Sequence, residues 1–218
     1  TGLIALGYFA DENEIKNSPT QTFGTVRPGD LKYKDINGDG LINANDMVPI
    51  GRSTIPEINY GFGASVGWKG IDVSVFFQGV GNVTQLMSGA TIWGFYEANF
   101  LLNNVYSDVA DNRWTVDNPN PNAKYPRMQI SENKNNKQPS TQKLRDMSFI
   151  RLKNAEVGYT FPKTLVKKTG LSNIRLYVQG VNLFTFSKFK LWDPEISSAE
   201  GSQYPNMRVV NVGLNLNF

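Results

Sequence analysis

The last ten residues of the chain, VVNVGLNLNF, alternate from Val210 onward between apolar residues and asparagine or glycine. Successive side chains of a β-strand point to opposite faces, so this alternation predicts a strand with one apolar and one polar face. The apolar face consists of Val210, Val212, Leu214, Leu216 and Phe218. A chain built from such strands must place their apolar faces against a protein core or against lipid, and this choice decides the class of fold.

Four earlier segments alternate in the same way, at residues 58–68, 71–79, 147–161 and 173–182. Lys69-Gly70 separates the first two and predicts a tight hairpin turn. The parity of the apolar residues changes within the third segment, which predicts a β-bulge near Lys153-Asn154. Residues 163–170 predict one helical turn that ends at Gly170.

The connections between these strands alternate between long and short. Long insertions occupy residues 11–56, 81–146 and 183–207, whereas the turns at residues 69–70 and 162–172 are short. Outer-membrane barrels have short periplasmic turns and longer extracellular loops. The predicted fold is therefore all-β, an antiparallel transmembrane β-barrel segment with three extracellular loops. Five strands, or six if residues 1–9 complete an earlier one, cannot enclose a polar lumen, so residues 1–218 are expected to be the C-terminal part of a larger barrel.

Several classes of protein are excluded by composition. No run reaches the roughly 18 consecutive apolar residues of a transmembrane helix. The chain has no cysteine in its sequence and its histidine count is 0, which removes disulfides, the usual zinc sites and the common nucleophile-base pairs. Its net charge of +3 is small, and its lysine and arginine residues are scattered along the sequence, so no nucleic-acid partner is expected.

The stretch DINGDGLINAND has the ligand spacing of an EF-hand-like calcium loop. Its candidate metal ligands are Asp35, Asn37, Asp39, Leu41, Asn43 and Asp46. An aspartate at the twelfth position is shorter than the usual bidentate glutamate, and no clear helix flanks the loop. Structural Ca²⁺ is one interpretation, and a surface loop of Asn-Gly and Asp-Gly turns is the other.

Aromatic residues in the predicted loops are candidates for substrate binding. They are Trp93, Phe95, Tyr96, Trp114 and Trp192. Such side chains could stack on sugar rings or pack against a partner protein, and the alternative is that they pack the small cores of their own loops. Helical spacing of apolar residues in 97–111 also predicts a short amphipathic helix.

Asp193 and Glu195 are the closest approach to a glycosidase carboxylate pair. Residues two apart on an extended segment point to opposite faces, and Asp193 precedes a proline, so a loop turn is expected instead. No catalytic and no cofactor-binding residue is predicted, and the chain is not expected to be an enzyme.

Six segments in order resemble the C-terminal third of the SusC/RagA family of TonB-dependent outer-membrane transporters. They are PGDLKYKDINGDGLINANDMVPIG, PEINYGFGASVGWKGIDVSVFFQG, NRWTVDNPNPNAKYPR, SFIRLKNAEVGYTFP, IRLYVQGVNLFTFSKFKLWDPE and the tail. The resemblance implies about five to six strands of a 22-stranded-type barrel in the cell outer membrane. It also implies contacts with lipid, with the remainder of the barrel and its plug, with TonB, with a SusD-like surface lipoprotein and with a glycan or peptide substrate.

Two other interpretations remain open from the sequence. One is a soluble calcium-binding β-domain or binding module, whose apolar faces would be buried in a sandwich. The other is an enzyme domain that acts on polysaccharide. The environment of Val212, Leu214 and Leu216 distinguishes the soluble β-domain from a barrel, because a sandwich would pack these side chains in a dry core.

Overall fold

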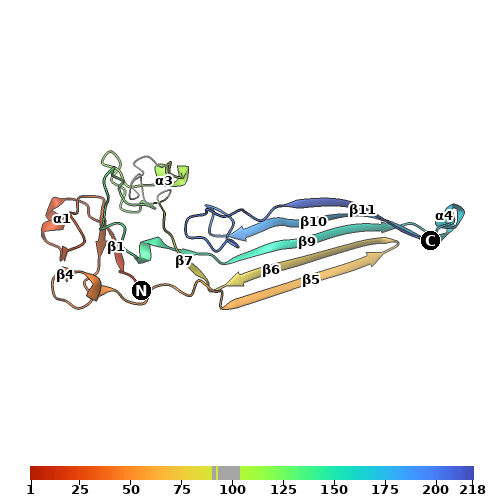
Figure 1. Ribbon diagram of the computed structural model, residues 1–218, viewed down its shortest axis with the longest axis horizontal. Helices are drawn as coiled ribbons and strands as arrows, with labels where there is room; N and C mark the ends of the chain where they lie inside the picture. Colours follow the sequence, from red (N-terminus) through yellow and green to blue (C-terminus); the bar gives the residue numbers. More distant parts are fainter. Residues whose placement is uncertain (90–91, 93–103) are drawn as a thin grey trace. The chain divides into compact units, whose positions relative to one another are not determined.

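The computed structural model describes residues 1–89, 92 and 104–218 (Figure 1). The chain divides into two compact units. The loop unit comprises Thr1–Arg52, Thr84–Arg145 and Ser198–Ser202, and the sheet unit comprises Ser53–Val83, Asp146–Ser197 and Gln203–Phe218. Within the described part of the chain, no helix is long and apolar enough to cross a membrane.

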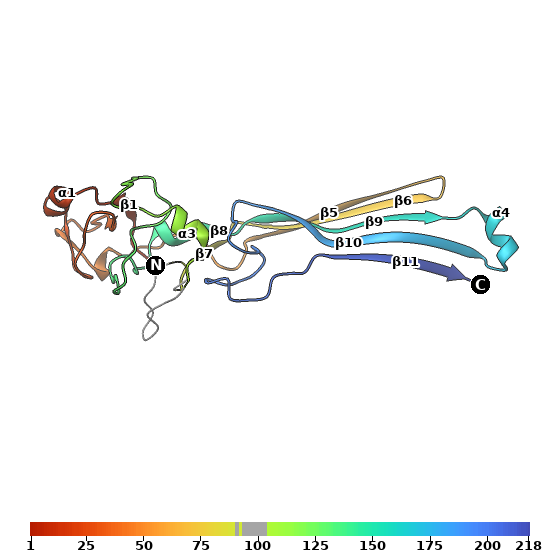
Figure 2. The same cartoon turned by 90° about the horizontal axis from the view of Figure 1, so that it is seen from above.

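The sheet unit is built on one antiparallel sheet of five long strands, in the order β11-β10-β9-β6-β5 (Figures 1 and 2). The strands are β5 (Ile58–Trp68), β6 (Ile71–Gly81), β9 (Phe149–Thr160), β10 (Asn173–Ser187) and β11 (Val209–Asn217). They are 9 to 15 residues long, which suits tilted strands that cross a bilayer. The predicted strands are confirmed.

The turns and irregularities predicted for these strands are also present. Lys69 (φ 48°) and Gly70 (φ 87°) make the left-handed two-residue turn between β5 and β6. The register between β6 and β9 shifts after Phe76, so that Lys153 is the extra residue of the predicted bulge. The turn between β9 and β10 contains α4 (Lys163–Val166) and η3 (Lys167–Thr169), and Gly170 ends it with φ 77°.

The fourth strand is longer than predicted. Residues 183–187, expected to begin an extracellular loop, continue β10 and pair with β9 as far as Ser187. Asn182 has a φ of 55°, and the register shifts between Val181 and Phe184. This bulge lets pairing resume beyond the residue at which the alternation becomes irregular.

The apolar side chains of the sheet form rows across all five strands. Register pairing places Val66, Val73, Val157, Val178 and Val212 side by side. Their neighbours form a second row of Trp68, Ile71, Tyr159, Leu176 and Leu214. Because these rows lie on one face, the sheet has a continuous apolar face that carries no charge.

That apolar face is not covered by other described residues. Val212 is 72% exposed, Val66 is 66% exposed and Trp68 is 67% exposed. A β-sandwich would bury the same side chains against a second sheet, and none packs on them within the described residues. A single sheet whose apolar face is left uncovered is typical of a barrel wall that faces lipid.

The loop unit consists of short elements. They are β1 (Ala5–Tyr8), α1 (Glu12–Lys16), β2 (Thr20–Gln21), β3 (Leu31–Tyr33), β4 (Leu41–Ile42), η1 (Ala44–Asp46), β7 (Thr84–Leu86), α3 (Ser107–Asp111), η2 (Thr141–Lys143) and β8 (Leu144–Asp146). β1 pairs with β3, β2 with β4, and β7 with β8. The suggestion that residues 1–9 complete a sixth strand of the large sheet is therefore wrong, because β1 pairs within this unit.

A compact core holds the loop unit together. Leu3, Leu31, Tyr33 and Ile42 form an apolar cluster with exposures of 0% or 1%. Beside it, Asn135 is fully buried; its Nδ2 donates to the Leu31 carbonyl at 2.9 Å and its Oδ1 accepts from Gln21 at 2.8 Å. Buried amides that satisfy backbone groups in this way replace the hydrogen bonds that a regular sheet would supply.

Candidate functional site

The polar face of the sheet carries charged residues that interact across strands. Arg175 of β10 reaches over β9 to Asp72 of β6, with its Nε 3.1 Å from Oδ1, and it also contacts Glu156 of β9 at 2.5 Å. Gly158 lies on β9, between β6 and β10, and a Cβ at this position would come within 2.3 Å of the Arg175 guanidinium. The glycine therefore provides the path along which the arginine crosses β9.

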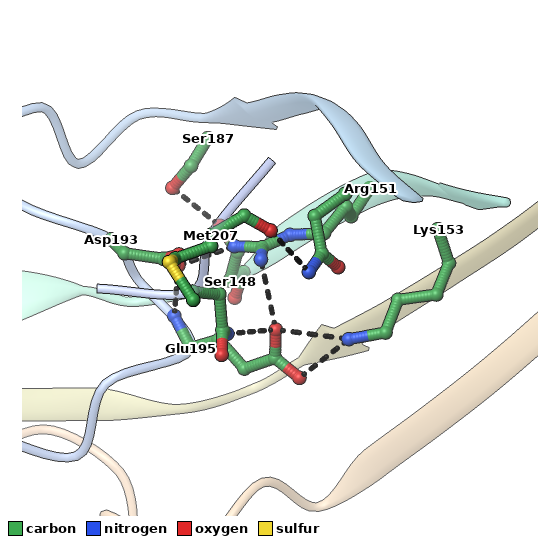
Figure 3. Close-up of polar contacts among 9 residues, drawn as sticks. Ser148, Arg151, Lys153, Ser187, Asp193, Glu195 and Met207 are labelled. Atoms are coloured by element: carbon green, nitrogen blue, oxygen red, sulfur yellow. Dashed lines mark hydrogen bonds and ion pairs between the residues drawn. The ribbon is translucent and has the colours of Figure 1, made fainter. Parts of the chain in front are cut away.

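A second charged cluster lies on the same face, near the end of the sheet from which the long connections leave. Figure 3 shows Arg151 of β9 between two carboxylates from the segment that follows β10. Its Nη2 binds Asp193, and its Nη1 is 3.1 Å from Glu195. Lys153, the bulged residue, lies 3.3 Å from Glu195, and the Asn206 amide donates to the same carboxylate at 2.7 Å.

The loop that supplies these carboxylates is a tight turn. Ile196 donates from its backbone to the Asp193 carbonyl at 3.0 Å, and the Glu195 N–H donates to the Asp193 side chain at 3.0 Å. The expectation of a turn at Asp193-Pro194 is confirmed. The expectation that the two carboxylates point apart is wrong, because the turn directs both toward the buried Arg151 guanidinium.

An open hollow of about 410 Å³ adjoins this cluster. It is lined by Arg151, Asn182, Thr185, Ser187, Phe189, Lys190, Trp192, Asp193, Pro194, Asn206 and Arg208. All of these residues belong to the sheet unit. The volume lies within the range of small-molecule binding pockets, and the lining combines aromatic, hydroxyl, amide and basic groups.

Trp192, one of the aromatic candidates, lines this hollow and packs edge-on against Phe189 with ring centroids 4.9 Å apart. Trp114 lies elsewhere, in the interior of the loop unit, at 5% exposure and against Gly29. Trp93, Phe95 and Tyr96 lie outside the described residues, as do residues 97–103 of the helix expected over 97–111, and residues 104–106 are not helical. Its last part is present as α3, with Val109 buried.

The EF-hand-like loop, residues 35–46, is held together by its own side chains. Asp35 accepts from the backbone of Gly38 at 2.7 Å and of Gly40 at 2.9 Å, and Asp39 accepts from Leu41 at 2.8 Å. Asn37 accepts from the Asp39 N–H, and Asn43 caps η1 through Asn45.

Asp46, the last candidate ligand of that loop, is completely buried. Its carboxylate accepts from the N–H groups of Ile36 and Asn43, at 2.8 and 2.9 Å. Burial raises the pKa of this carboxyl, but backbone donors at Asn43, Ile36 and Asn37 outweigh it and hold the pKa below its ordinary value.

Among the described residues, no three acidic side chains gather closely enough to hold a metal ion. A calcium ion at this loop would therefore depend on amide and backbone oxygens as well as carboxylates. Calcium binding stays a prediction, which calorimetric titration of the full receptor with Ca²⁺ would test.

Sequence reasoning did not identify Arg151 or Lys153 as site residues. The bulge at Lys153 marked the region, since bulges often redirect a side chain next to a functional site. Nothing in the local pattern indicated their partners, which are 42 residues away along the chain.

The comparisons with known proteins agree with this architecture. TonB-dependent receptor P26 of Formosa agariphila is 32% identical over 234 residues, which cover 100% of this chain and 22% of that receptor. TonB-dependent receptor P3 of the same organism is 32% identical over 215 residues, covering 89% of this chain and 20% of the receptor. The chain thus spans about a fifth of the length of these relatives. No model of a protein family matches it.

Solved structures share the fold. The structure of the RagAB peptide importer in the open-open state matches all of this chain, with a TM-score of 0.72, 23% identity and 22% of the matched chain covered. The closed-closed state gives a TM-score of 0.70 and 24% identity, with 100% of this chain and 22% of the matched chain covered.

The sheet and its two faces define the chain as a segment of an antiparallel transmembrane β-barrel. It belongs to the TonB-dependent receptors, of which it corresponds to a part, and the resemblance found in its sequence is confirmed. Because these receptors are outer-membrane proteins, the chain is located in the cell outer membrane.

Proposed function

We propose that this chain forms part of the wall and the extracellular loops of a receptor that imports a nutrient, a glycan or a peptide, across the outer membrane. The observation that carries the proposal is the two-faced sheet, whose charge-free face suits lipid and whose opposite face carries charges, in a chain that matches a TonB-dependent receptor along its whole length. The long segments 11–56, 82–146 and 188–207 would face the outside of the cell.

The complete receptor would work with partners that this part does not contain. We propose a SusD-like surface lipoprotein that covers the barrel, and a plug through which TonB opens it. The support is the fold that this chain shares with the structures of the RagAB peptide importer. The role of the present residues would be binding and enclosure rather than catalysis, as in the receptors to which they are similar.

Uptake by living cells tests the proposal. The gene that encodes the full receptor would be deleted, and the uptake of fluorescently labelled oligosaccharides and peptides would be compared with that of the complemented strain. We expect the loss of uptake of at least one labelled substrate, and the same loss in a strain without TonB. Unchanged uptake of the whole panel would contradict import, and loss that does not depend on TonB would contradict the energy source.

Co-purification tests the lipoprotein partner separately. A tagged full receptor, extracted in mild detergent, is expected to bring down one lipoprotein in a fixed ratio. A receptor that purifies alone and still imports its substrate would contradict the proposed lid.

A further inference from the structure

The hollow beside Arg151 contains two buried polar atoms whose hydrogen-bonding capacity is not used. The Nε of Arg151 and the Oδ1 of Asn182 are both buried and accept or donate no hydrogen bond within the described residues. Both residues line the hollow, and Arg151 is only 1% exposed. Buried polar groups are almost always paired, so two unpaired ones at the same hollow indicate a place where another molecule supplies the partners.

The two atoms differ in their requirement. Arg151 Nε is a donor and needs an acceptor, whereas Asn182 Oδ1 is an acceptor and needs a donor. A bare carboxylate would satisfy the arginine and leave the asparagine unpaired. A hydroxyl group both donates and accepts, so a hydroxylated ligand matches both atoms.

The charge around the hollow is positive. The Arg151 charge is neutralised by Asp193, and Glu195 is shared with Lys153. Lys190 and Arg208 remain at the exposed rim, and neither forms an ion pair with a carboxylate among the described residues. Two unneutralised cations favour an anionic ligand, to which they would form charge-assisted hydrogen bonds.

The remaining lining suits a ring. Trp192, packed against the buried Phe189, provides aromatic surface, Thr185 adds a hydroxyl, and Asn206 adds the amide oxygen that Glu195 does not bind. Ser187 is already engaged, because its hydroxyl donates to the Ser148 carbonyl at 2.8 Å (Figure 3). The lining is more polar than that of a usual small-molecule pocket, which suits a ring that carries hydroxyl groups.

We propose that this hollow is a binding site for an anionic sugar, a hydroxylated ring that carries a carboxylate or a sulfate. The ring hydroxyls pair with Arg151 Nε and Asn182 Oδ1, and the anionic group lies between Lys190 and Arg208. The site deepens the proposed import function, on which it rests, by naming the chemical class of the imported molecule. The ion pairs of Asp193 and Glu195 hold in place the turn that forms one side of the hollow.

The test is calorimetric titration of the full receptor in detergent with four probes: trigalacturonic acid, a sulfated galactotriose, neutral galactotriose and triglutamate. We expect both anionic sugars to bind, with an affinity that falls as salt is added. The neutral sugar is expected to bind at least about tenfold more weakly, which corresponds to the loss of one charge-assisted contact. Absence of binding by both anionic sugars would overturn the proposal.

Variants connect the binding to the hollow. The double variant Lys190→Gln and Arg208→Gln is expected to weaken the anionic sugars by roughly tenfold or more and to leave the neutral sugar unchanged. The matched control is Lys167→Gln with Lys168→Gln, which removes the same charge from the exposed turn between β9 and β10. Equal affinities in both double variants would overturn the location. Triglutamate binding as tight as that of the sugars, with the same dependence on Lys190 and Arg208, would overturn the sugar in favour of acidic peptides.

The two proposals fail in distinguishable ways. If deletion abolishes uptake but the rim variants bind like the wild type, the import function stands and the site is wrong. If deletion leaves the uptake of every labelled substrate unchanged while binding still depends on Lys190 and Arg208, the site stands and import is wrong.

Discussion

The two units of this chain treat apolar and polar side chains in opposite ways. In the sheet unit, large apolar residues such as Val212 and Trp68 are 72% and 67% exposed. In the loop unit, Leu3, Leu31 and Ile42 are 0% exposed, and the polar Asn135 is buried with them. Both units are made from the same kinds of amino acid, and they differ in where those amino acids are placed.

The difference shows that the two units are adapted to different surroundings. The loop unit buries its apolar groups as a domain in water does, because the hydrophobic effect rewards removal of that surface from water. The sheet unit presents its apolar groups outward in rows, which is favourable only where the surroundings are themselves apolar. Lipid around the sheet and water around the loops satisfy both requirements.

The largest expected effect comes from a charge on the apolar face. Val212→Lys places an ammonium group in the central valine row, near the middle of β11. If the row faces lipid, the substitution costs about 2–4 kcal/mol and strongly reduces barrel assembly. The measurement is the fraction of receptor in the outer membrane that resists unfolding by detergent at room temperature, as judged by its shifted migration on a gel.

The control for this variant is Asn211→Lys, one residue away on the polar face, where Asn211 lies opposite Gln179. We expect nearly normal assembly because the added charge faces the polar interior. Equal loss in both variants would mean that the two faces do not differ in their surroundings, and the comparison between the units would collapse.

A smaller effect is expected in the loop unit. Asn135→Ala removes the amide that binds the Leu31 carbonyl and Gln21, and it leaves buried polar atoms unpaired. The expected loss is about 1–3 kcal/mol of local stability, with normal assembly of the barrel. Limited proteolysis of the assembled receptor is expected to cleave the loop unit faster.

Asn122→Ala is the matched control, since Asn122 is exposed and its side chain forms no hydrogen bond within the described residues. Faster cleavage in both variants would indicate that the loops have no core of their own. Failure of Asn135→Ala to assemble in the membrane would indicate that the sheet depends on the loops.

The sheet was largely predictable from the sequence, because its determinants are local. Alternation assigned Val66, Val157 and Val212 to one face, and the parity change at Lys153 located the bulge. The end of β10 was not predictable in this way, since Asn182 interrupts the alternation and only the pairing with β9 shows that the strand continues.

The loop core and the candidate site were much less predictable. Asn135 binds Leu31 across 104 positions of sequence, and Arg151 binds Asp193 across 42. Such contacts are set by the path of the chain in three dimensions, and no periodicity encodes them. The turn at Asp193 was predicted, but the direction of its carboxylates depends on Arg151, which the local sequence does not contain.

A third prediction concerns the crossing of Arg175 over β9. Gly158→Ala introduces a Cβ within 2.3 Å of the guanidinium and is expected to displace Arg175 from Asp72. Overpacking of this kind typically costs about 1–3 kcal/mol, and a flexible arginine places the effect at the lower end. The temperature at which the barrel unfolds is the measurement. Gly67→Ala is the control. Gly67 lies on β5, opposite Asp72 of β6, and the nearest atom to its added Cβ is 3.9 Å away. Equal changes of the unfolding temperature in the two variants would mean that Arg175 adapts to the added Cβ without a loss of stability.

The smallest expected effect is the pH dependence of the loop at Asp46. Backbone donors hold the pKa of this buried carboxyl below its ordinary value of about 4, in spite of burial, which raises it. A carboxyl whose pKa is lower in the folded state contributes stability above its unfolded pKa, and that stability is lost as the pH falls through the folded value. Hydrogen exchange of residues 35–47, corrected for the intrinsic rate, is therefore expected to accelerate below about pH 4.

In Asp46→Asn, the loop is expected to exchange faster at neutral pH and to change less with acid, because one acceptor becomes a donor facing an N–H group. Asp117→Asn, at an exposed position, is expected to behave as the wild type. An acid response that persists undiminished in Asp46→Asn would assign the pH dependence to another carboxyl.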